Sequence, residues 1–319
     1  MKRFSGNVRA PFLDYMSPGI YMITLNKLPW APAFSSIIEN DGRFGTTGPA
    51  IALHTKLGQA IRYSFQDFHD RYPSIDFWHH IIMENHIHFI LYINTKLDEK
   101  LGRYIARFKS FIKEKAEYKG IIPRQAPSLF EEGFNDQYIG LTRNLQAVYD
   151  YLDDNPNRYW EIKNHPENFV KINNLEIKGE HYRAYGNLNL LKNPFITPVI
   201  YHRRYSEVEY LEKKSLWQYV RANGGVLISP FIHPREKDLL KEVILRSGKV
   251  ILFDYIPDNS KWKPYKQLFE MCKRGELLIL SPHGHEKLLP LRKGEHVSRQ
   301  ESLFLNGHAE KIAGEGFPV

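Results

Sequence analysis

His86 and His88 stand two residues apart in a segment where polar and apolar residues alternate. In a β-strand, such residues point to the same face, so the two imidazoles would lie on one face, roughly 6.5–7 Å apart along the strand. Ile87, Phe89 and Leu91 would form the other, buried face. Two imidazoles at this spacing suit a divalent cation if a third ligand comes from another element. The alternative is a half-exposed strand with two polar histidines and no ligand.

Tyr151 and Asn155 form a second pair that could do chemistry. They are four residues apart in a segment with helical periodicity, which we expect to run from Leu141 to Asn155 and to end before Pro156. The pair would project from one side of this helix, at the flank of its buried stripe. A phenol there is placed to reach a ligand on a sheet, with an amide oxygen one turn away. The alternative is ordinary amphipathic packing, with a boundary tyrosine and an asparagine that ends the helix.

The elements that must position these residues follow a β-α-β-β-α-β order. Strands are expected at residues 19–26, 76–83, 86–94 and within 128–139, and helices at 55–71, 97–118 and 141–155. The segment between the first strand and the first helix is rich in proline and glycine and is expected to be a loop. This order predicts an α+β fold, with a ferredoxin-like antiparallel sheet and helices on one face.

The helix expected at 97–118 has a basic side opposite its apolar side, formed by Arg103, Arg107, Lys109 and Lys113 together with Lys115. A basic helix face of this kind is usually exposed to solvent and binds no partner. Few acidic residues oppose these cations, however, and they could follow a phosphate backbone. The formal net charge of +8 likewise favours a polyanionic partner, first of all nucleic acid.

The second half of the chain has a different order of expected strands and helices. Residues 161–195 are polar and rich in asparagine, and we expect them to be a connecting segment. Strands are then expected at 196–202, 226–229, 250–255 and 277–281, and helices at 206–223, 234–247, 263–274 and from 298. This alternation predicts a parallel, Rossmann-like α/β domain, and we place the domains at residues 1–185 and 186–319. No decisive motif marks a ligand site there, so a structural or protein-contact role is favoured over a nucleotide site.

Size and composition set wider bounds. The chain has 319 residues, enough for two domains, and its 42% hydrophobic and 25% charged residues are typical of a globular protein. No run of about 18 apolar residues occurs, so no membrane span is expected. Cys272 is the only cysteine, which excludes an intrachain disulfide. Together with the lack of a signal-peptide pattern, this leads us to expect a cytoplasmic protein.

His86-Ile87-His88 resembles the His-hydrophobic-His motif of the IS200-like transposases, in particular the REP-associated tyrosine transposases. Three more segments resemble that family's motifs in the same order: Phe108-Lys109-Ser110, Gly133-Phe134-Asn135-Asp136 and Tyr151-Leu152-Asp153-Asp154-Asn155-Pro156. The resemblance covers residues 15–160. This sequence departs from the family pattern at Glu84, where a proline is usual, and at Phe130, where many members have tryptophan.

The resemblance implies a nuclease domain of the HUH type that acts on single-stranded DNA with hairpins, as a monomer or homodimer. His86 and His88 would hold Mg²⁺ or Mn²⁺ with Asn155 as third ligand, although imidazoles alone would also accept Zn²⁺. The phenol of Tyr151 would attack the scissile phosphate and form a 5′-phosphotyrosine, which conserves the energy needed to rejoin strands. Arg103, Arg107, Lys109 and Lys113 would contact the DNA.

Two other function classes remain open. The chain could be a domesticated descendant that binds DNA hairpins without cutting them. Alternatively, it could be a nucleotide-sensing protein centred on residues 190–319.

Overall fold

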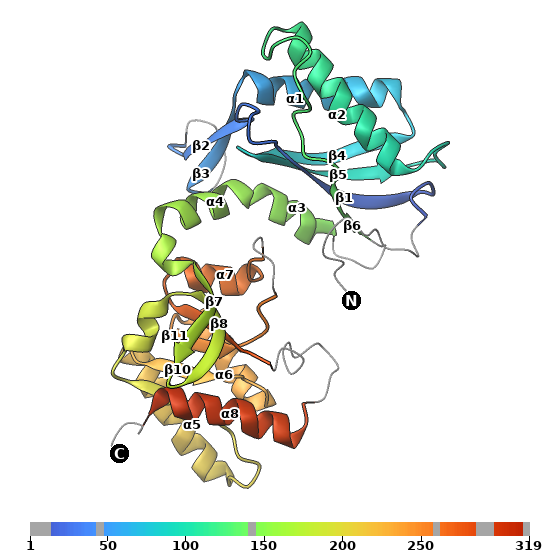
Figure 1. The fold of residues 1–319 in the computed structure, drawn as a ribbon. Helices are drawn as coiled ribbons and strands as arrows, with labels where there is room; N and C mark the ends of the chain where they lie inside the picture. The colour runs from blue at the N-terminus through green and yellow to red at the C-terminus, as the bar shows by residue number, and fades with distance from the viewer. Residues whose placement is uncertain (1–13, 43–47, 140–144, 258–261, 285–296, 315–319) are drawn as a thin grey trace. The chain divides into compact units, whose positions relative to one another are not determined.

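The computed structural model describes residues 14–42, 48–139, 145–257, 262–284 and 297–314 (Figure 1). Contacts between Cα atoms divide the chain into two units, Met1–Trp160 and Glu161–Val319. Each unit has a β-sheet with helices packed against it, and antiparallel pairing occurs in both, so the α+β class expected from the sequence is confirmed. No described helix is long and apolar enough to cross a membrane.

The first unit is built on a four-stranded antiparallel sheet with the order β4-β5-β1-β6. Its strands are β1 (Gly19–Asn26), β4 (Ile75–Ile82), β5 (His86–Ile93) and β6 (Asn135–Tyr138), and its helices are α1 (Lys56–Arg71), α2 (Leu101–Tyr118), α3 (Leu145–Asp153) and the start of α4 (Asn155–Asn164). β1, α1, β4, β5, α2 and β6 follow one another in the predicted β-α-β-β-α-β order. β5 is hydrogen-bonded to a neighbour on both sides.

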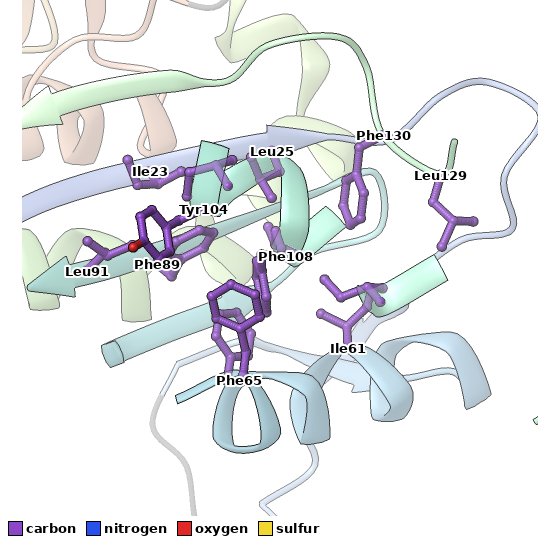
Figure 2. Close-up of a cluster of buried hydrophobic side chains, with 14 of the residues drawn as sticks. Ile23, Leu25, Ile61, Phe65, Phe89, Leu91, Tyr104, Phe108, Leu129 and Phe130 are labelled. Atoms are coloured by element: carbon purple, nitrogen blue, oxygen red, sulfur yellow. The ribbon is translucent and has the colours of Figure 1, made fainter. Parts of the chain in front are cut away.

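One face of this sheet carries the core of the unit. Ile87, Phe89 and Leu91 of β5 are at most 1% exposed and belong to one buried cluster with residues of α1 and α2. Phe89 and Leu91 are labelled in Figure 2 with Phe65 and Phe108 of these helices. Phe65 of α1 and Phe108 of α2 meet there, with ring centroids 5.0 Å apart. Because side chains alternate along a strand, the residues between these apolar positions point to the opposite face. The sheet therefore has one face covered by α1 and α2 and one face that carries the histidines.

A two-stranded antiparallel sheet lies in the segment expected to be a loop. It consists of β2 (Ser35–Glu39) and β3 (Ala50–His54). Both strands are short and flanked by proline and glycine, so their own pattern is too brief to indicate a strand. The pair packs with Met83 and Trp160 in a small separate core, which supports the start of α4.

The helix expected at residues 141–155 is in fact two helices. α3 ends at Asp153 and α4 begins at Asn155, so Pro156 lies in the first turn of α4 instead of ending a helix. Proline is tolerated there because the first N–H groups of a helix have no intrahelical acceptor. Residues 141–144 lie outside the described part of the chain.

The second unit has a six-stranded sheet with the order β7-β8-β12-β11-β10-β9. Its strands are β7 (Val170–Ile177), β8 (Glu180–Gly186), β9 (Ile196–Pro198), β10 (Val226–Ser229), β11 (Lys249–Phe253) and β12 (Leu277–Pro282), and its helices are α5 (Glu207–Ala222), α6 (Pro234–Leu245), α7 (Lys266–Lys273) and α8 (Arg299–Ala313), with 3₁₀ turns at Pro166–Asn168 and Leu188–Lys192. The strands β9 to β12 are parallel, as predicted. Side chains from α5, α6 and α7 pack on one face of the sheet, and α8 packs on the other.

β7 and β8 are an antiparallel addition at the edge of this sheet, in the segment expected to be a connection. The unit therefore begins after Trp160, whereas the sequence places the boundary near residue 185. β7 is an edge strand with exposed Asn173 and Asn174, and its pairing is interrupted between Ile172 and Leu175. A bulge breaks the alternation by which a strand is identified in a sequence.

Candidate active site

His86 and His88 lie on the face of the sheet opposite α1 and α2. Their ring centroids are 4.5 Å apart, with the ring planes at 76°. His88 is 8% exposed, and its Nδ1 lies 2.7 Å from the hydroxyl of Thr24, its register partner on β1. His86 is half-buried, and its Nδ1 lies 2.7 Å from Oδ1 of Asn85. Both imidazoles are thus oriented by a neighbouring polar group.

These hydrogen bonds bear on the ability of the rings to hold a cation. The amide oxygen of Asn85 can only accept, so Nδ1 of His86 carries the proton and Nε2 carries the lone pair of the neutral ring. A metal-bound imidazole uses one nitrogen as ligand and donates through the other. The ring of His86 is therefore held in a tautomer that can ligate a metal through Nε2.

α3 brings Tyr151 to this face. The helix contacts β4 on the side of the sheet away from α1 and α2 (Figure 1). It is fastened there by Asp153, whose carboxylate is 2.7 Å from Nε2 of His79, and by a ring contact between His79 and Tyr149. Tyr151 is 39% exposed, and its ring centroid lies 6.2 Å from that of His88. The structure therefore brings together a phenol and an imidazole that are distant in the sequence.

Asn155 and Arg158 complete the surroundings of Tyr151. Nδ2 of Asn155 donates to the backbone oxygen of Tyr151 at 2.7 Å, so Oδ1 is the atom that this amide would offer to a cation. The guanidinium of Arg158 lies 5.8 Å from the centre of the Tyr151 ring. Arg158 is buried, with 5% of the residue exposed. The sequence reasoning missed Arg158. It lies beyond Pro156, where the helix was expected to have ended.

Two other tyrosines near this face are poorer candidates for a nucleophile. Burial raises the pKa of Tyr149, which disfavours its phenolate. The hydroxyl of Tyr159 donates to Oε2 of Glu84 at 2.6 Å, and this hydrogen bond raises the pKa of Tyr159 to about 12. Tyr151 is thus the phenol placed beside both an imidazole and a guanidinium.

The donor set fits a cation that accepts nitrogen and oxygen ligands. Among the residues that the structure describes, no three His, Cys, Asp or Glu side chains gather closely enough to hold a metal. A cation here would depend on His86 and His88, an amide oxygen such as that of Asn155, and oxygens from water or a substrate phosphate. Mg²⁺ and Mn²⁺ tolerate such incomplete protein shells, whereas structural Zn²⁺ sites usually have four protein ligands.

The basic residues of α2 are not brought together with Tyr151, because α2 packs on the opposite face of the sheet. Arg107 pairs with Glu99 at 2.6 Å and Lys113 with Glu117 at 2.9 Å, while Arg103 is exposed. The predicted DNA contacts of Arg103, Arg107, Lys109 and Lys113 remain a prediction.

Lys109 has a partner within the fold. Its ammonium donates to the backbone oxygens of Glu131 and Gly133, and burial lowers the pKa of Lys109 to about 8. The Phe108-Lys109-Ser110 segment is thereby joined to the loop that precedes β6.

An aromatic pair lies on the histidine face: the alternation of the strand places Tyr92 there, whereas its partner Trp78 was missed. Tyr92 is four residues after His88 on β5, so both project from the same side. Its ring lies 4.8 Å from that of Trp78, which is 39% exposed and stands at the β4 bulge between Phe77 and His79. Because the bulge disturbs the alternation of β4, the sequence does not reveal to which face Trp78 points.

Comparison with known proteins gives distant similarities. No family model matches the chain, and no curated protein matches its sequence. A solved structure of a REP-associated tyrosine transposase bound to a REP hairpin is similar over 52% of this chain and 76% of its own, at 13% identity and a TM-score of 0.28. A candidate transposase from Deinococcus radiodurans R1 is similar over 48% of this chain and 97% of its own, at 9% identity and a TM-score of 0.28. Similarity at this level carries no conclusion about chemistry, which has to rest on the site.

Proposed function

We propose that the first unit is an HUH-type nuclease domain and that the protein is a metal-dependent tyrosine transposase. In this proposal it cleaves and rejoins single-stranded DNA with hairpin structure through a 5′-phosphotyrosine on Tyr151. In the same proposal, the second unit is an accessory, Rossmann-like domain.

The observation that carries the proposal is the meeting of Tyr151 with the two imidazoles. The phenol ring lies 6.2 Å from the His88 ring, which in turn lies 4.5 Å from the His86 ring. A protein that only binds DNA has no need for a phenol, two oriented imidazoles and a buried arginine in one place. Phosphodiester cleavage needs a nucleophile and positive charge around one phosphate, and this arrangement offers both.

In the proposed reaction, Oη of Tyr151 forms a bond to phosphorus while the bond from phosphorus to O3′ breaks. The phenol loses its proton, and the departing O3′ gains one to become a free 3′-hydroxyl. The guanidinium of Arg158 lies 5.8 Å from the centre of the Tyr151 ring and would offer positive charge to the phosphate that the phenol attacks. Attack of a 3′-hydroxyl on the phosphotyrosine reverses these steps and joins strands without a nucleotide triphosphate.

His86, His88 and Asn155 are the residues that would hold Mg²⁺ or Mn²⁺. When bound, such an ion supplies Lewis-acid polarisation of the scissile phosphate. Asn85 and Thr24 would keep the imidazoles in the orientation that ligation requires.

The single strand would have to cross the face of the sheet that carries His88. Trp78 and Tyr92 lie on this face and present aromatic rings on which unpaired bases can stack. Arg103 and its neighbours on α2 could contact only DNA that continues around the edge of the sheet.

The test is adduct formation. The full chain is incubated with a single-stranded DNA hairpin and Mn²⁺, and products are separated in SDS. We expect an SDS-resistant protein–DNA adduct that disappears in Tyr151→Phe and persists in Tyr149→Phe, the matched control on the same helix. An adduct in Tyr151→Phe would overturn the assignment of the nucleophile. Hairpin binding by the wild-type chain without any adduct would favour the non-cleaving alternative.

A further inference from the structure

The second unit has an open hollow of about 550 Å³ at the carboxyl end of β12. It is lined by polar residues from three segments: Asn173 and Asn174 of the β7 bulge, His181 and Arg183 of β8, and His283 directly after β12. In parallel α/β sheets, ligands bind at the carboxyl ends of the strands. No carboxylate is among these described lining residues, so the hollow favours an anion.

The two imidazoles of the hollow are held in place by the bulge. Nδ1 of His181 lies 2.9 Å from Oδ1 of Asn174, and Nε2 of His283 lies 2.7 Å from the backbone oxygen of Asn173. Both oxygens can only accept, so these ring nitrogens carry protons. β-Bulges are common beside functional sites because they redirect side chains, and here the bulge supplies both acceptors.

Arg183 adds a permanent positive charge. One nitrogen of its guanidinium donates to the backbone oxygen of Ile256 at 3.3 Å. The guanidinium has five N–H groups, so others can donate to an anion. Its register partner on β12 is Ser281, which therefore projects from the same face. Ser281 is 1% exposed, and its hydroxyl has no hydrogen-bond partner among the residues that the structure describes. Ser281 is not among the described residues that line the hollow, so its hydroxyl is not assigned a contact to the ligand.

The carboxyl group of Asp254 does not strongly disfavour the binding of an anion in this hollow. Asp254 follows β11 and is not among the residues that line the hollow. Burial raises the pKa of Asp254, because a carboxylate is poorly solvated there.

We propose that this hollow binds the phosphate of a nucleotide. Arg183 would donate to the phosphate oxygens. His181 and His283 would do so through their second ring nitrogens in the imidazolium form, which a bound anion favours. A second hollow of about 210 Å³ shares both histidines and is also lined by Phe304, whose ring offers a surface for the base. Glu180 also lines it, but its carboxylate is paired with Lys311 at 2.7 Å. The inference goes beyond the transposase proposal and does not depend on it.

The experiment is isothermal titration of the full chain, without Mn²⁺, with ATP, AMP and inorganic phosphate. We expect both nucleotides to bind more tightly than inorganic phosphate. Loss of one charge-assisted contact in Arg183→Gln should weaken nucleotide binding about 10-fold or more. The matched control is Arg246→Gln, because Arg246 is an exposed arginine whose ion pair with Glu242 is long, at 3.8 Å.

A second variant keeps the test decisive if Arg183→Gln fails to fold. His181 is exposed, so His181→Ala should melt like the wild type and still weaken binding several-fold, whereas His165→Ala should change nothing. Equal affinity in Arg183→Gln and His181→Ala, or no binding of any ligand at millimolar concentration, would overturn the proposal. Displacement of bound nucleotide by a 5′-phosphorylated single strand would show that the site also accepts nucleic-acid phosphates; lack of displacement would restrict it to free nucleotides.

Discussion

The hydroxyl of Thr24 lies 2.7 Å from Nδ1 of His88, across the register pair that joins β1 to β5. This contact orients the imidazole from behind, in the manner of the partners that support metal-binding histidines. We predict that Thr24→Val weakens Mn²⁺ binding about 10-fold while the fold is kept, and that Thr24→Ser restores it. Titration of Mn²⁺ followed by electron paramagnetic resonance measures the affinity directly. An unchanged affinity in Thr24→Val would show that the hydroxyl does not support a metal site.

Glu84 and Tyr159 join the turn before β5 to α4. The hydroxyl of Tyr159 donates to the Glu84 carboxylate at 2.6 Å, so Glu84 links the turn before the imidazole strand to the helix that begins with Asn155. We predict a coupling of about 1–3 kcal/mol in a double-mutant cycle of Glu84→Gln and Tyr159→Phe, measured by urea unfolding. The rate of adduct formation should fall in both single variants. Additive effects on stability would show that this hydrogen bond contributes nothing.

Trp78 is predicted to be a DNA contact. Its exposed ring, which contacts Tyr92 at a tilt on the histidine face, can stack on an unpaired base, and loss of one such base stack costs about 1–3 kcal/mol. Trp78→Ala should therefore weaken binding of a single-stranded oligonucleotide roughly 5- to 150-fold in fluorescence anisotropy. Arg107→Gln on α2, where the guanidinium already pairs with Glu99, is the control expected to change affinity little. The reverse order of effects would place the DNA along α2.

Lys109 is predicted to support the fold more than DNA binding. Lys109→Ala removes the donor for two backbone oxygens, those of Glu131 and Gly133, and should lower the free energy of unfolding by about 1–3 kcal/mol. Affinity for single-stranded DNA should stay within about twofold when measured well below the melting temperature, because the ammonium is already engaged. A variant of full stability and poor DNA affinity would restore Lys109 as a DNA contact.

His80 predicts a loss of stability in acid. Burial lowers the pKa of His80 to about 4, and its ring stacks on Phe65 at 4.3 Å. Below the ordinary histidine value of 6.5, the unfolded chain binds a proton that the folded chain does not, so His80 makes stability fall as the pH drops from 6.5 to 4. Unfolding free energies at several pH values should show a shallower fall in His80→Gln than in the wild type. If stability fell equally steeply with pH in His80→Gln and in the wild type, the lowered pKa of His80 would be contradicted.

The sequence predicts best where a pattern is long and uninterrupted. The alternation around His86 and His88 predicts a strand and its two faces, and β5 matches that segment almost residue for residue. The pairs Ser206–Glu209 and Ser298–Glu301 likewise mark helix starts, because each forms a capping box whose chemistry is local.

The sequence predicts poorly where the local pattern is broken or where three-dimensional packing decides. Pro156 is expected to end a helix, yet it lies in the first turn of α4, and Arg158 was therefore not considered as part of a helix beside Tyr151. The bulges of β4 and β7 disturb the alternation that would have identified Trp78 as part of the histidine face and β7 as a strand.

The pairing of β5 on both edges also limits how this protein can vary. Sliding such a strand by a single position would exchange its two sets of side chains, turning Ile87 and Phe89 outward and both imidazoles into the aromatic interior. A one-residue insertion or deletion within β5 would thus disrupt folding and the proposed chemistry together. Changes in length can accumulate in the loops, but the histidine strand can diverge only by substitution.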